Sequence, residues 1–527
     1  MKAMRALVLL SSAASLSVIA DANAADLPLK AKAVEYVRVC SLYGAGFWYI
    51  PGTDTCIRIG GYVRADTTIN GGASHGQPAW NGDSGQHNRF ADVFISRSRM
   101  ALQVDTRTAT EYGVVRTYMQ GNFQFNNFGN SNPSSLGAAV SPPGGLSSSL
   151  LNGVGGGYVT PEYIFLQFAG FTFGRSASAY ATPWQGFPAN ITSYLMGGQN
   201  SDTGVNNIQY TAQFGNGVSA TLGLEDPTAY DRTSLYNLSV GLNAVGTSSF
   251  AYGGMTAPDI NGNIRVDQAW GLVQLSAAAH EVNASYNVLG PGAAPTALSV
   301  LSGHPDSKWG GSVMAALNIK NLPTGAGDDF KIDTSYAKGL TKNVIATAAA
   351  SPNFAMFGGS SVAYQSIGFG ATTDAVFLPV ASGGTGDLKL TDAWGVRGSF
   401  THNWDPHWNS SVFGGASWVH YDGSATDITT AKGQYCFQYM TSNKLTAATT
   451  SADFRCNPDF AVFQIGFNTR WTPVKNLTFT GEVQYVRLDQ NFTGTATLAP
   501  AAPMPTTTYE FKDQNTVLLQ VRAQRNF

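Results

Sequence analysis

The chain ends with the stretch Val517-Leu-Leu-Gln-Val-Arg-Ala-Gln-Arg-Asn-Phe527, in which apolar and polar side chains alternate. One face of this stretch carries Val517, Leu519, Val521, Ala523 and Phe527, and the other carries Gln520, Arg522, Gln524 and Asn526. Successive side chains of a β-strand point to opposite faces, so the alternation predicts a strand with one apolar and one polar side. Such a strand, ending on an aromatic residue, is typical of the closing strand of an outer-membrane β-barrel.

Other segments repeat this period of two, which indicates further half-exposed strands. In 56–66, Ile57, Ile59 and Val63 lie opposite Arg58, Arg64 and Asp66. In 96–105, Met100, Leu102 and Val104 lie opposite Arg97, Arg99, Gln103 and Asp105. The segments 461–471 and 477–485 also alternate, and they flank 472–476, a short turn of the periplasmic kind.

Long insertions rich in Gly, Ser, Asn and Thr separate other strands, at 127–157, 176–206, 285–307, 350–386 and 422–457. Structureless loops of this length argue against a compact soluble domain, whereas surface loops of large porins reach it. At ~10 residues per spanning strand, a 16-stranded barrel uses about 31 residues per strand and connection, although fourteen or eighteen strands fit as well. We predict an all-β fold, a transmembrane antiparallel β-barrel over 56–527, preceded by a short N-terminal segment at 25–55.

The start of the chain has the pattern of a secretory signal peptide. Lys2 and Arg5 precede the apolar run 6–20, and Ala22-Asn-Ala24 follows it. This arrangement predicts a signal peptide over 1–24, cleaved before Ala25. A retained membrane anchor is the alternative, but the apolar run is shorter than the ~20 residues that a spanning helix needs.

The composition favours one large barrel over two to four soluble domains. Charged residues make up 12% of the chain, aromatic residues another 12%, and glycine accounts for 59 of 527 positions. Soluble domains usually contain ~25% charged residues. After the signal peptide no apolar run is long enough for a membrane helix. The formal charge of −2 and the lack of a basic tract argue against a nucleic-acid partner.

Four cysteines form two couples that are close in sequence. Cys40 and Cys56 are 16 residues apart, and Cys436 and Cys456 are 20 residues apart. In an oxidising compartment, local pairing is the simplest of the three possible connectivities. We expect the disulfides Cys40–Cys56 and Cys436–Cys456. A zinc site is the alternative, but the chain lacks the C-x-x-C spacing of such sites, and we expect no metal.

Two further motifs are not interpreted as functional sites: the first is an accidental match and the second has a structural explanation. Gly72-Ala-Ser-His-Gly76 matches the G-x-S-x-G pattern of hydrolases, but it lies in a loop sequence without the strand and helix that a nucleophile elbow requires. His402 and His407 bracket an aromatic turn in which Trp404 and Trp408 are interpreted as anchors at the membrane interface rather than neighbours of a metal.

Three blocks of the sequence resemble the alphaproteobacterial general porins. They are Gly46-Phe-Trp-Tyr-Ile-Pro-Gly-Thr-Asp-Thr-Cys-Ile-Arg-Ile-Gly-Gly-Tyr-Val-Arg64, Phe165-Leu-Gln-Phe-Ala-Gly-Phe-Thr-Phe-Gly-Arg175 and Asn263-Ile-Arg-Val-Asp-Gln-Ala-Trp-Gly271. Together with the C-terminal strand, these three blocks spread the resemblance over the whole length of the mature chain. The resemblance implies a homotrimer of 16-stranded barrels, each with its own channel narrowed by a third loop folded into the lumen. That loop corresponds to 176–206.

At a porin constriction, acidic side chains on the loop usually lie opposite basic side chains on the wall. The expected loop carries one acid, Asp202. The candidate basic wall residues are Arg58, Arg64, Arg97, Arg99, Arg116 and Arg175. Some of these could instead lie at the rim or pair with Asp66 and Asp105, because sequence does not fix the strand register. We predict weak or anion-leaning selectivity.

These observations favour a passive diffusion channel for ions and small hydrophilic solutes, with no cofactor. It would lie in the bacterial outer membrane, in contact with lipid and lipopolysaccharide. A solute-selective channel for sugars or an anion is the alternative, and it would need a ladder of aromatic or lysine side chains along the lumen. A barrel hydrolase would need a Ser/His/Asp-type set on the wall, which the sequence does not reveal, so we expect no enzyme.

Overall fold

A computed structural model describes residues 38–71, 93–126, 157–192, 195–227, 232–346 and 353–527, with positions 85, 87 and 89. The predicted signal peptide, the motif at 72–76 and nearly all of the insertion at 127–157 lie outside the described residues. No helix in the described ranges is long and apolar enough to cross a membrane. The same ranges contain no group of three or more His, Cys, Asp or Glu side chains that could hold a metal ion.

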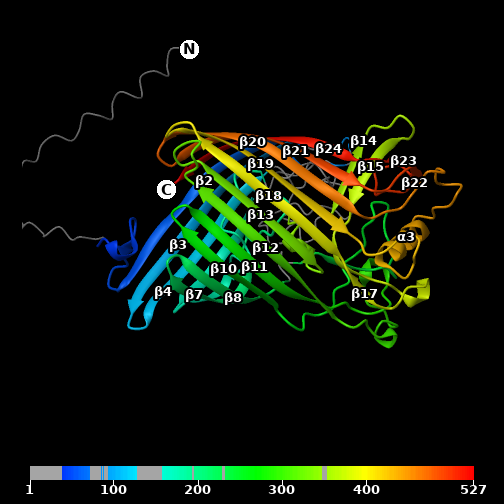
Figure 1. The fold of residues 1–527 in the computed structure, drawn as a ribbon, viewed down its shortest axis with the longest axis horizontal. Coiled ribbons are helices and arrows are strands. Elements are labelled where there is room, and N and C mark those ends of the chain that lie inside the picture. The colour runs from blue at the N-terminus through cyan, green and yellow to red at the C-terminus, as the bar shows by residue number, and fades with distance from the viewer. Residues whose placement is uncertain are drawn as a thin grey trace, which may run out of the picture.

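Sixteen of the described strands close into one antiparallel barrel (Figure 1). They are β2 (Thr55–Ile69), β3 (Phe94–Thr110), β4 (Gly113–Asn126), β5 (Gly157–Phe168), β6 (Phe171–Ser176), β7 (Val205–Gly215), β8 (Val218–Glu225), β10 (Asp259–Gln268), β11 (Gly271–Val282), β12 (Lys308–Lys320), β13 (Asp329–Lys338), β18 (Asp392–Asn403), β19 (Trp408–His420), β20 (Phe460–Val474), β21 (Leu477–Gln490) and β24 (Gln514–Asn526). Each strand pairs with the next one in this order. The predicted fold class is therefore confirmed.

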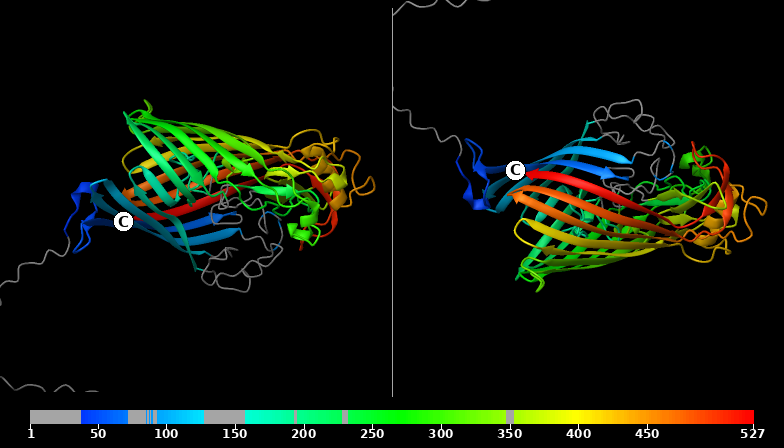
Figure 2. Two further views of the ribbon diagram at one scale, coloured as in Figure 1. Left: turned by 90° about the horizontal axis from the view of Figure 1, so that it is seen from below. Right: turned by 90° about the horizontal axis from the view of Figure 1, so that it is seen from above.

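The ring closes between its first and last strands. The pairing of β2 with β24 runs from Tyr62 opposite Asn526 to Ile69 opposite Leu519. Figure 2 shows the last strand lying beside the first ones. A further strand, β1 (Trp48–Tyr49), pairs with the beginning of β2. Closure leaves no strand edge unpaired in the ring, as a membrane-spanning sheet requires.

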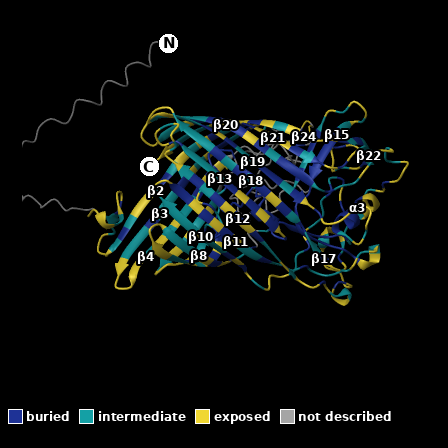
Figure 3. Cartoon of the chain, in the orientation of Figure 1, coloured by how far each residue is buried: buried dark blue, intermediate teal, exposed yellow. Residues whose placement is uncertain are grey.

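The period of two in the sequence corresponds to an apolar outer face and a polar lumen. Figure 3 shows the matching alternation of exposed and buried residues along the strands. In β3, the side chain of Met100 is 40% exposed while Arg97 is 3% exposed. In β24, Val521 is 54% exposed and Gln520 is fully buried. Apolar side chains on the outside suit lipid, because an outward arginine or lysine at mid-bilayer costs ~2–4 kcal/mol.

Short turns and long loops alternate around the barrel, as in outer-membrane barrels. The turns at 111–112, 169–170, 216–217, 269–270, 321–328, 404–407 and 475–476 lie at one end, which we call the short-turn end. Asn216 and Gly217 both have positive φ, which the type I′ hairpin requires and which glycine adopts without strain. Trp408 and Trp471 stack at this end with ring centroids 5.8 Å apart.

The two histidines of the aromatic turn make separate contacts. His402 Nδ1 lies 2.7 Å from Asp328 Oδ2, and His407 Nδ1 lies 2.9 Å from the carbonyl oxygen of Thr472. The His402 ring packs edge-on against Trp404, with centroids 4.3 Å apart. These contacts give both rings structural partners at the short-turn end.

At the other end the long loops build a folded cap. The insertions 350–386 and 422–457, which the sequence identified only as long surface loops between strands, contain strands and a helix. One cap sheet contains β14 (Phe354–Gly358), β15 (Gln365–Gly370), β22 (Thr495–Leu498) and β23 (Thr507–Phe511), and another contains β9 (Ser234–Asn237), β16 (Thr373–Phe377) and β17 (Leu388–Leu390). The helix α3 (Ala431–Ser442) packs with them around Phe369, Tyr435 and Phe492. This core combines residues from four loops, so the sequence of any one loop does not reveal it.

Short 3₁₀ turns complete the described elements. They are η1 (Ser41–Tyr43), η2 (Pro291–Ala293), η3 (Val300–Ser302), η4 (Thr341–Asn343) and η5 (Val380–Ser382).

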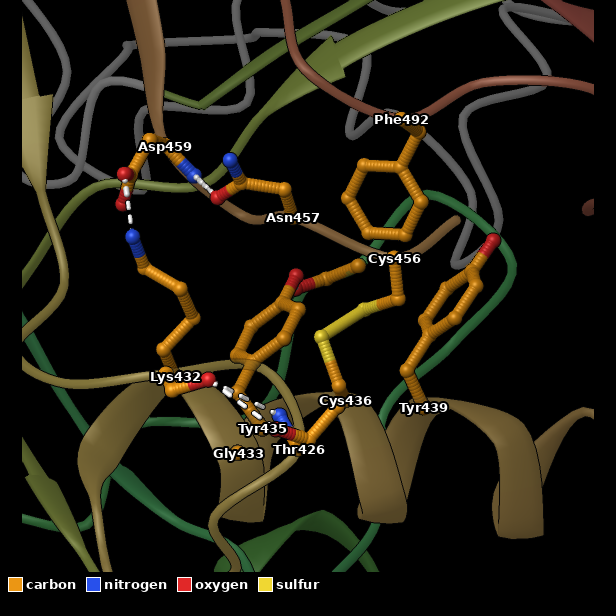
Figure 4. The surroundings of a disulfide bond; sticks show 12 residues. Thr426, Lys432, Gly433, Tyr435, Cys436, Tyr439, Cys456, Asn457, Asp459 and Phe492 are labelled. Carbon is orange, nitrogen blue, oxygen red and sulfur yellow. Dashed lines mark hydrogen bonds and ion pairs between the residues drawn. A yellow bond between two sulfur atoms is a disulfide. The ribbon is translucent and has the colours of Figure 1, made fainter. Parts of the chain in front are cut away.

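Both expected disulfides are confirmed, and they lie at opposite ends of the barrel. Cys40–Cys56 joins the N-terminal segment to the start of β2 at the short-turn end. Cys436–Cys456 joins α3 to the segment that leads into β20 (Figure 4). Beside the second bridge, Lys432 Nζ lies 2.5 Å from Asp459 Oδ2, and the Tyr439 hydroxyl donates to the carbonyl oxygen of Ala244 at 3.0 Å. The second bridge thus pins the helix of the cap.

Replacing Cys436 and Cys456 together with serine is expected to loosen the cap without opening the barrel. The bridge closes a loop with a sequence separation of 20, a constraint worth about 3 kcal/mol in the chain-entropy account. Limited proteolysis of the folded protein should cleave the variant faster within 422–457, while heat-modifiable migration on a gel is retained. The matched control, Cys40→Ser with Cys56→Ser, should leave cap cleavage unchanged. Equal cleavage of all three proteins would contradict this role of Cys436–Cys456.

Candidate pore constriction

The segment between β6 and β7 folds into the barrel, and we call residues 177–204 the lumen loop. β6 extends to Ser176 and β7 begins at Val205, so the loop is slightly shorter than the predicted 176–206. Residues 193–194 lie outside the described ranges. Tyr180, Leu195 and Met196 are fully buried. A loop of polar backbone can be buried in this way only if its N–H and C=O groups find partners.

The first half of the loop follows the wall from β10 to β13. Asn263 Nδ2 donates to the carbonyl oxygen of Ala179 at 2.5 Å, and Gln274 Nε2 donates to that of Ala181 at 2.9 Å. Further on, Trp184 Nε1 donates to Asp333 Oδ2 at 2.6 Å. Inward side chains of β10 and β11 therefore hold the loop backbone, and one of β13 holds the Trp184 side chain.

The middle of the loop reaches the wall formed by β20, β21 and β24. The backbone N–H groups of Ile191 and Thr192 donate to the two oxygens of Glu482, at 2.7 and 2.9 Å. Arg522 Nη2 donates to the carbonyl oxygen of Ile191 at 2.9 Å, and Arg470 also donates to the loop, at Ala189. Hydrogen bonds to ionised groups are stronger than neutral ones, so these contacts fix the loop across the lumen.

The returning half of the loop is held by Arg397 of β18. Its guanidinium donates to Asp333 at 2.9 Å and to the carbonyl oxygens of Leu195, Gly198 and Gln199 at 3.2, 3.3 and 2.7 Å. The side chains of Arg397 and Asp333 are both 0% exposed. Removing one partner of a buried pair typically costs ~3–5 kcal/mol, because the other charge is left without compensation. This pair is an anchor of the loop rather than a contact for solutes.

Glycines allow the returning half to approach the wall closely. Gly197 has φ +115°, and a Cβ atom there would lie 2.3 Å from the carbonyl oxygen of Val396. On the wall, a Cβ atom at Gly415 would lie 2.2 Å from the carbonyl oxygen of Met196. A side chain at either position would force the loop and the wall apart.

A row of arginines faces the lumen on β24, β2 and β3. Arg97 Nε and Arg522 Nε donate to different oxygens of the buried carboxylate of Asp66, at 3.0 and 2.5 Å. On the neighbouring positions, Arg64 Nε donates to Gln524 at 2.8 Å and Arg99 Nε donates to Gln124 at 2.8 Å. Arg99 also lies 3.9 Å from Glu162 of β5. The strand register places Asp66 opposite both Arg97 and Arg522, which explains the shared carboxylate.

The predicted site residues separate into two levels along the barrel. Arg64, Arg97 and Arg99 lie in the arginine row, and Arg175 donates to the carbonyl oxygen of Thr203 at 2.7 Å, beside Asp202 at the end of the loop. Arg58 and Arg116 lie instead near the short-turn end, 3.8 and 3.1 Å from Asp105.

Sequence reasoning missed Arg397, Arg470, Arg522, Asp333 and Glu482. Of these, Arg470, Arg522 and Glu482 stand on polar faces that the alternation identifies. Nothing in that pattern distinguishes them from other inward residues, since the loop that they bind is distant in sequence.

Comparisons with known proteins agree with this architecture. A family model described as the porin subfamily matches residues 26–520. Porin Omp2b of Brucella suis biovar 1 (strain 1330) and Porin Omp2b of Brucella abortus (strain 2308) are each 31% identical to this chain over 274 residues. Each alignment covers 50% of this chain and 63% of the relative, so it spans less than two thirds of the relative's length.

Among solved structures, the outer membrane channel DcaP of Acinetobacter baumannii has a similar fold. The TM-score is 0.55 at 14% sequence identity, and the match covers 91% of this chain and 99% of that chain. At this identity the likeness concerns the fold alone.

Replacing Gly415 with alanine is expected to push the lumen loop toward the opposite wall and lower the ion conductance of the lumen. The added Cβ atom would meet the backbone of Met196, which cannot rotate away as a side chain could. Single-channel recording in a planar bilayer measures the change. Gly481→Ala is the matched control, because a Cβ atom at this strand glycine meets nothing within 4 Å. Equal conductance of the two variants would contradict close packing of the loop on β19.

Proposed function

The chain belongs to the porin subfamily, and we propose that it forms a water-filled channel in the bacterial outer membrane for passive diffusion of ions and small hydrophilic solutes. The observation that carries this proposal is the lumen loop, which spans a polar, closed barrel and is fixed to its far wall by Glu482, Arg397 and Arg522. A rigid loop in a polar lumen narrows a passage and sets its charge. Family membership favours a channel over an enzyme.

The charges around the lumen loop support a preference for anions. Six arginines surround it: Arg64, Arg97, Arg99, Arg175, Arg470 and Arg522. Five carboxylates also contact the loop or the arginines: Asp66, Glu162, Asp202, Glu225 and Glu482. Six arginines against five carboxylates leave an excess of one positive charge, while the buried pair Arg397–Asp333 is neutral as a unit. Fixed positive charge in a narrow, low-dielectric passage attracts anions.

The assembly and surroundings follow from the same proposal. We infer that three copies associate, each with its own channel, as the resemblance to general porins implies. The outward belt of apolar side chains would contact membrane lipid, and lipopolysaccharide would surround the outer rim. Residues 1–24 would act as a cleaved signal for export. The apolar belt supports membrane insertion, because outward residues such as Val63, Leu222 and Leu275 are more than half exposed.

Reversal-potential measurements test the proposed selectivity. Across a potassium chloride gradient, the unmodified protein should give the sign of a channel that favours chloride. Replacing Arg64 and Arg99 together with glutamine removes two positive charges from the arginine row and should shift the potential toward potassium. Both arginines hydrogen-bond to glutamine side chains. After the substitution Asp66 keeps Arg97 and Arg522, and Glu162, which loses the ion pair with Arg99, keeps its hydrogen bond from Asn122.

Arg525→Gln is the matched control. Arg525 lies near the end of β24, where it donates to the backbone of Lys475 at the short-turn rim. Its loss should leave the reversal potential unchanged. A cation preference of the unmodified protein would overturn the proposed selectivity, and folded, heat-modifiable protein without any conductance would overturn the channel itself.

A further inference from the structure

A second basic site lies at the short-turn end, away from the lumen loop. A cavity of about 490 Å³ opens there between the N-terminal segment and strands β3 to β7. Tyr43, Arg107, Val114, Arg116, Gln167 and Thr172 belong to its lining. Arg107 and Arg116 face each other across β3 and β4 in the strand register. The cavity thus combines charged, polar and apolar walls.

The carboxylate of Asp105 lies close to three arginines at this cavity. Asp105 accepts hydrogen bonds from Nε and Nη2 of Arg107 at 3.2 and 3.0 Å and from Nε and Nη2 of Arg116, both at 3.1 Å, and Arg58 lies 3.8 Å away. The Asp105 side chain is 2% exposed, whereas those of Arg107 and Arg116 are each 27% exposed. The carboxylate is buried behind the guanidinium groups, which carry an excess of two positive charges toward the lumen.

Aromatic rings hold these guanidinium groups in place. Phe47 of the N-terminal segment lies 5.0 Å from the Arg107 guanidinium carbon and 5.1 Å from that of Arg58. On the barrel wall, Tyr118 lies 5.2 Å from that of Arg116. The disulfide Cys40–Cys56 fixes Phe47 beside the start of β2. Cation–π contacts and the disulfide therefore orient the arginines before any ligand arrives.

We propose that this cavity binds small carboxylates that carry a compact apolar body. The Nε and Nη2 groups of both arginines already bind Asp105, and Arg116 Nη1 donates to Gln167 at 2.8 Å. The outer edge of the Arg107 guanidinium, formed by Nη1 and Nη2, is the fork that a solute carboxylate would bind, and the excess charge attracts it. Val114 and the ring of Tyr43 offer an apolar wall for the rest of the molecule. The proposal rests on the proposed function, since such a solute would reach the site through the channel, and it adds a saturable step to passive diffusion.

Block of chloride current by benzoate tests the site. Benzoate added at the short-turn side of single channels should reduce the current with a saturable concentration dependence. Arg107→Gln with Arg116→Gln should raise the midpoint about tenfold or more, because two charged donors are lost. Benzyl alcohol, a neutral molecule of similar shape, should not block. Equal block by benzyl alcohol, or an unchanged midpoint in the double variant, would overturn the proposal.

The matched control is Arg265→Gln at the same level of the barrel. Arg265 pairs with Asp267 at 2.8 Å and lies outside the cavity lining, so its loss should leave the benzoate midpoint unchanged. If the glutamine double variant does not fold, Arg107→Lys with Arg116→Lys keeps both charges but removes the forks, and it should still raise the midpoint. An unchanged midpoint there would overturn the proposal as well. Chloride conductance without benzoate reports the channel separately, so failure of the site and failure of the proposed function are distinguishable.

Discussion

The barrel depends on one constraint: backbone N–H and C=O groups in the hydrocarbon core of a membrane have no water to bind and must pair within the protein. Pairing of β24 with β2 satisfies it by removing the last free edges. Once the ring is closed, the period of two places every second side chain in lipid and the others in the lumen. Apolar residues such as Val521 then face outward and polar residues such as Gln520 face the lumen, because their positions in the alternation alone decide the side. The polar lumen is thus a consequence of closure.

A polar lumen also makes a buried loop possible. In an apolar core, the backbone N–H and C=O groups of the loop 177–204 would be buried without partners. In the polar lumen, inward side chains of the wall supply the missing donors and acceptors. Glu482 receives two N–H groups, and Arg397 binds three carbonyl oxygens while it is neutralised by Asp333. Arg522 of the arginine row also binds the loop, at the carbonyl oxygen of Ile191, whereas Arg64 and Arg99 of the same row are held by the neutral side chains of Gln524 and Gln124.

Local patterns in the sequence predicted the features that depend on neighbouring residues. Alternation located β2, β3, β20, β21 and β24, and proximity in sequence predicted both disulfides. The cap was missed because its core joins Phe369, Tyr435 and Phe492 from separate loops. Arg58 and Arg116 could not be separated from Arg97 and Arg99, since their place along the barrel depends on register and not on face. The wall residues that bind the loop were missed because the loop that distinguishes them from other inward residues is distant in sequence.

The two basic levels act on solutes independently, and their spacing along β3 gives the reason. Arg97 and Arg107 are ten positions apart on one strand, which corresponds to roughly 33 Å along that strand. With a tilt of about 40°, the separation along the barrel axis is about 25 Å. Charges in solution are largely screened beyond the Debye length of ~8 Å at physiological salt. The field of the arginine row therefore hardly reaches the cavity at Arg107 and Arg116. Selection by charge belongs to the level of the lumen loop, where the passage is narrowed, whereas any retention of a solute at the short-turn end must come from direct contact with the side chains there.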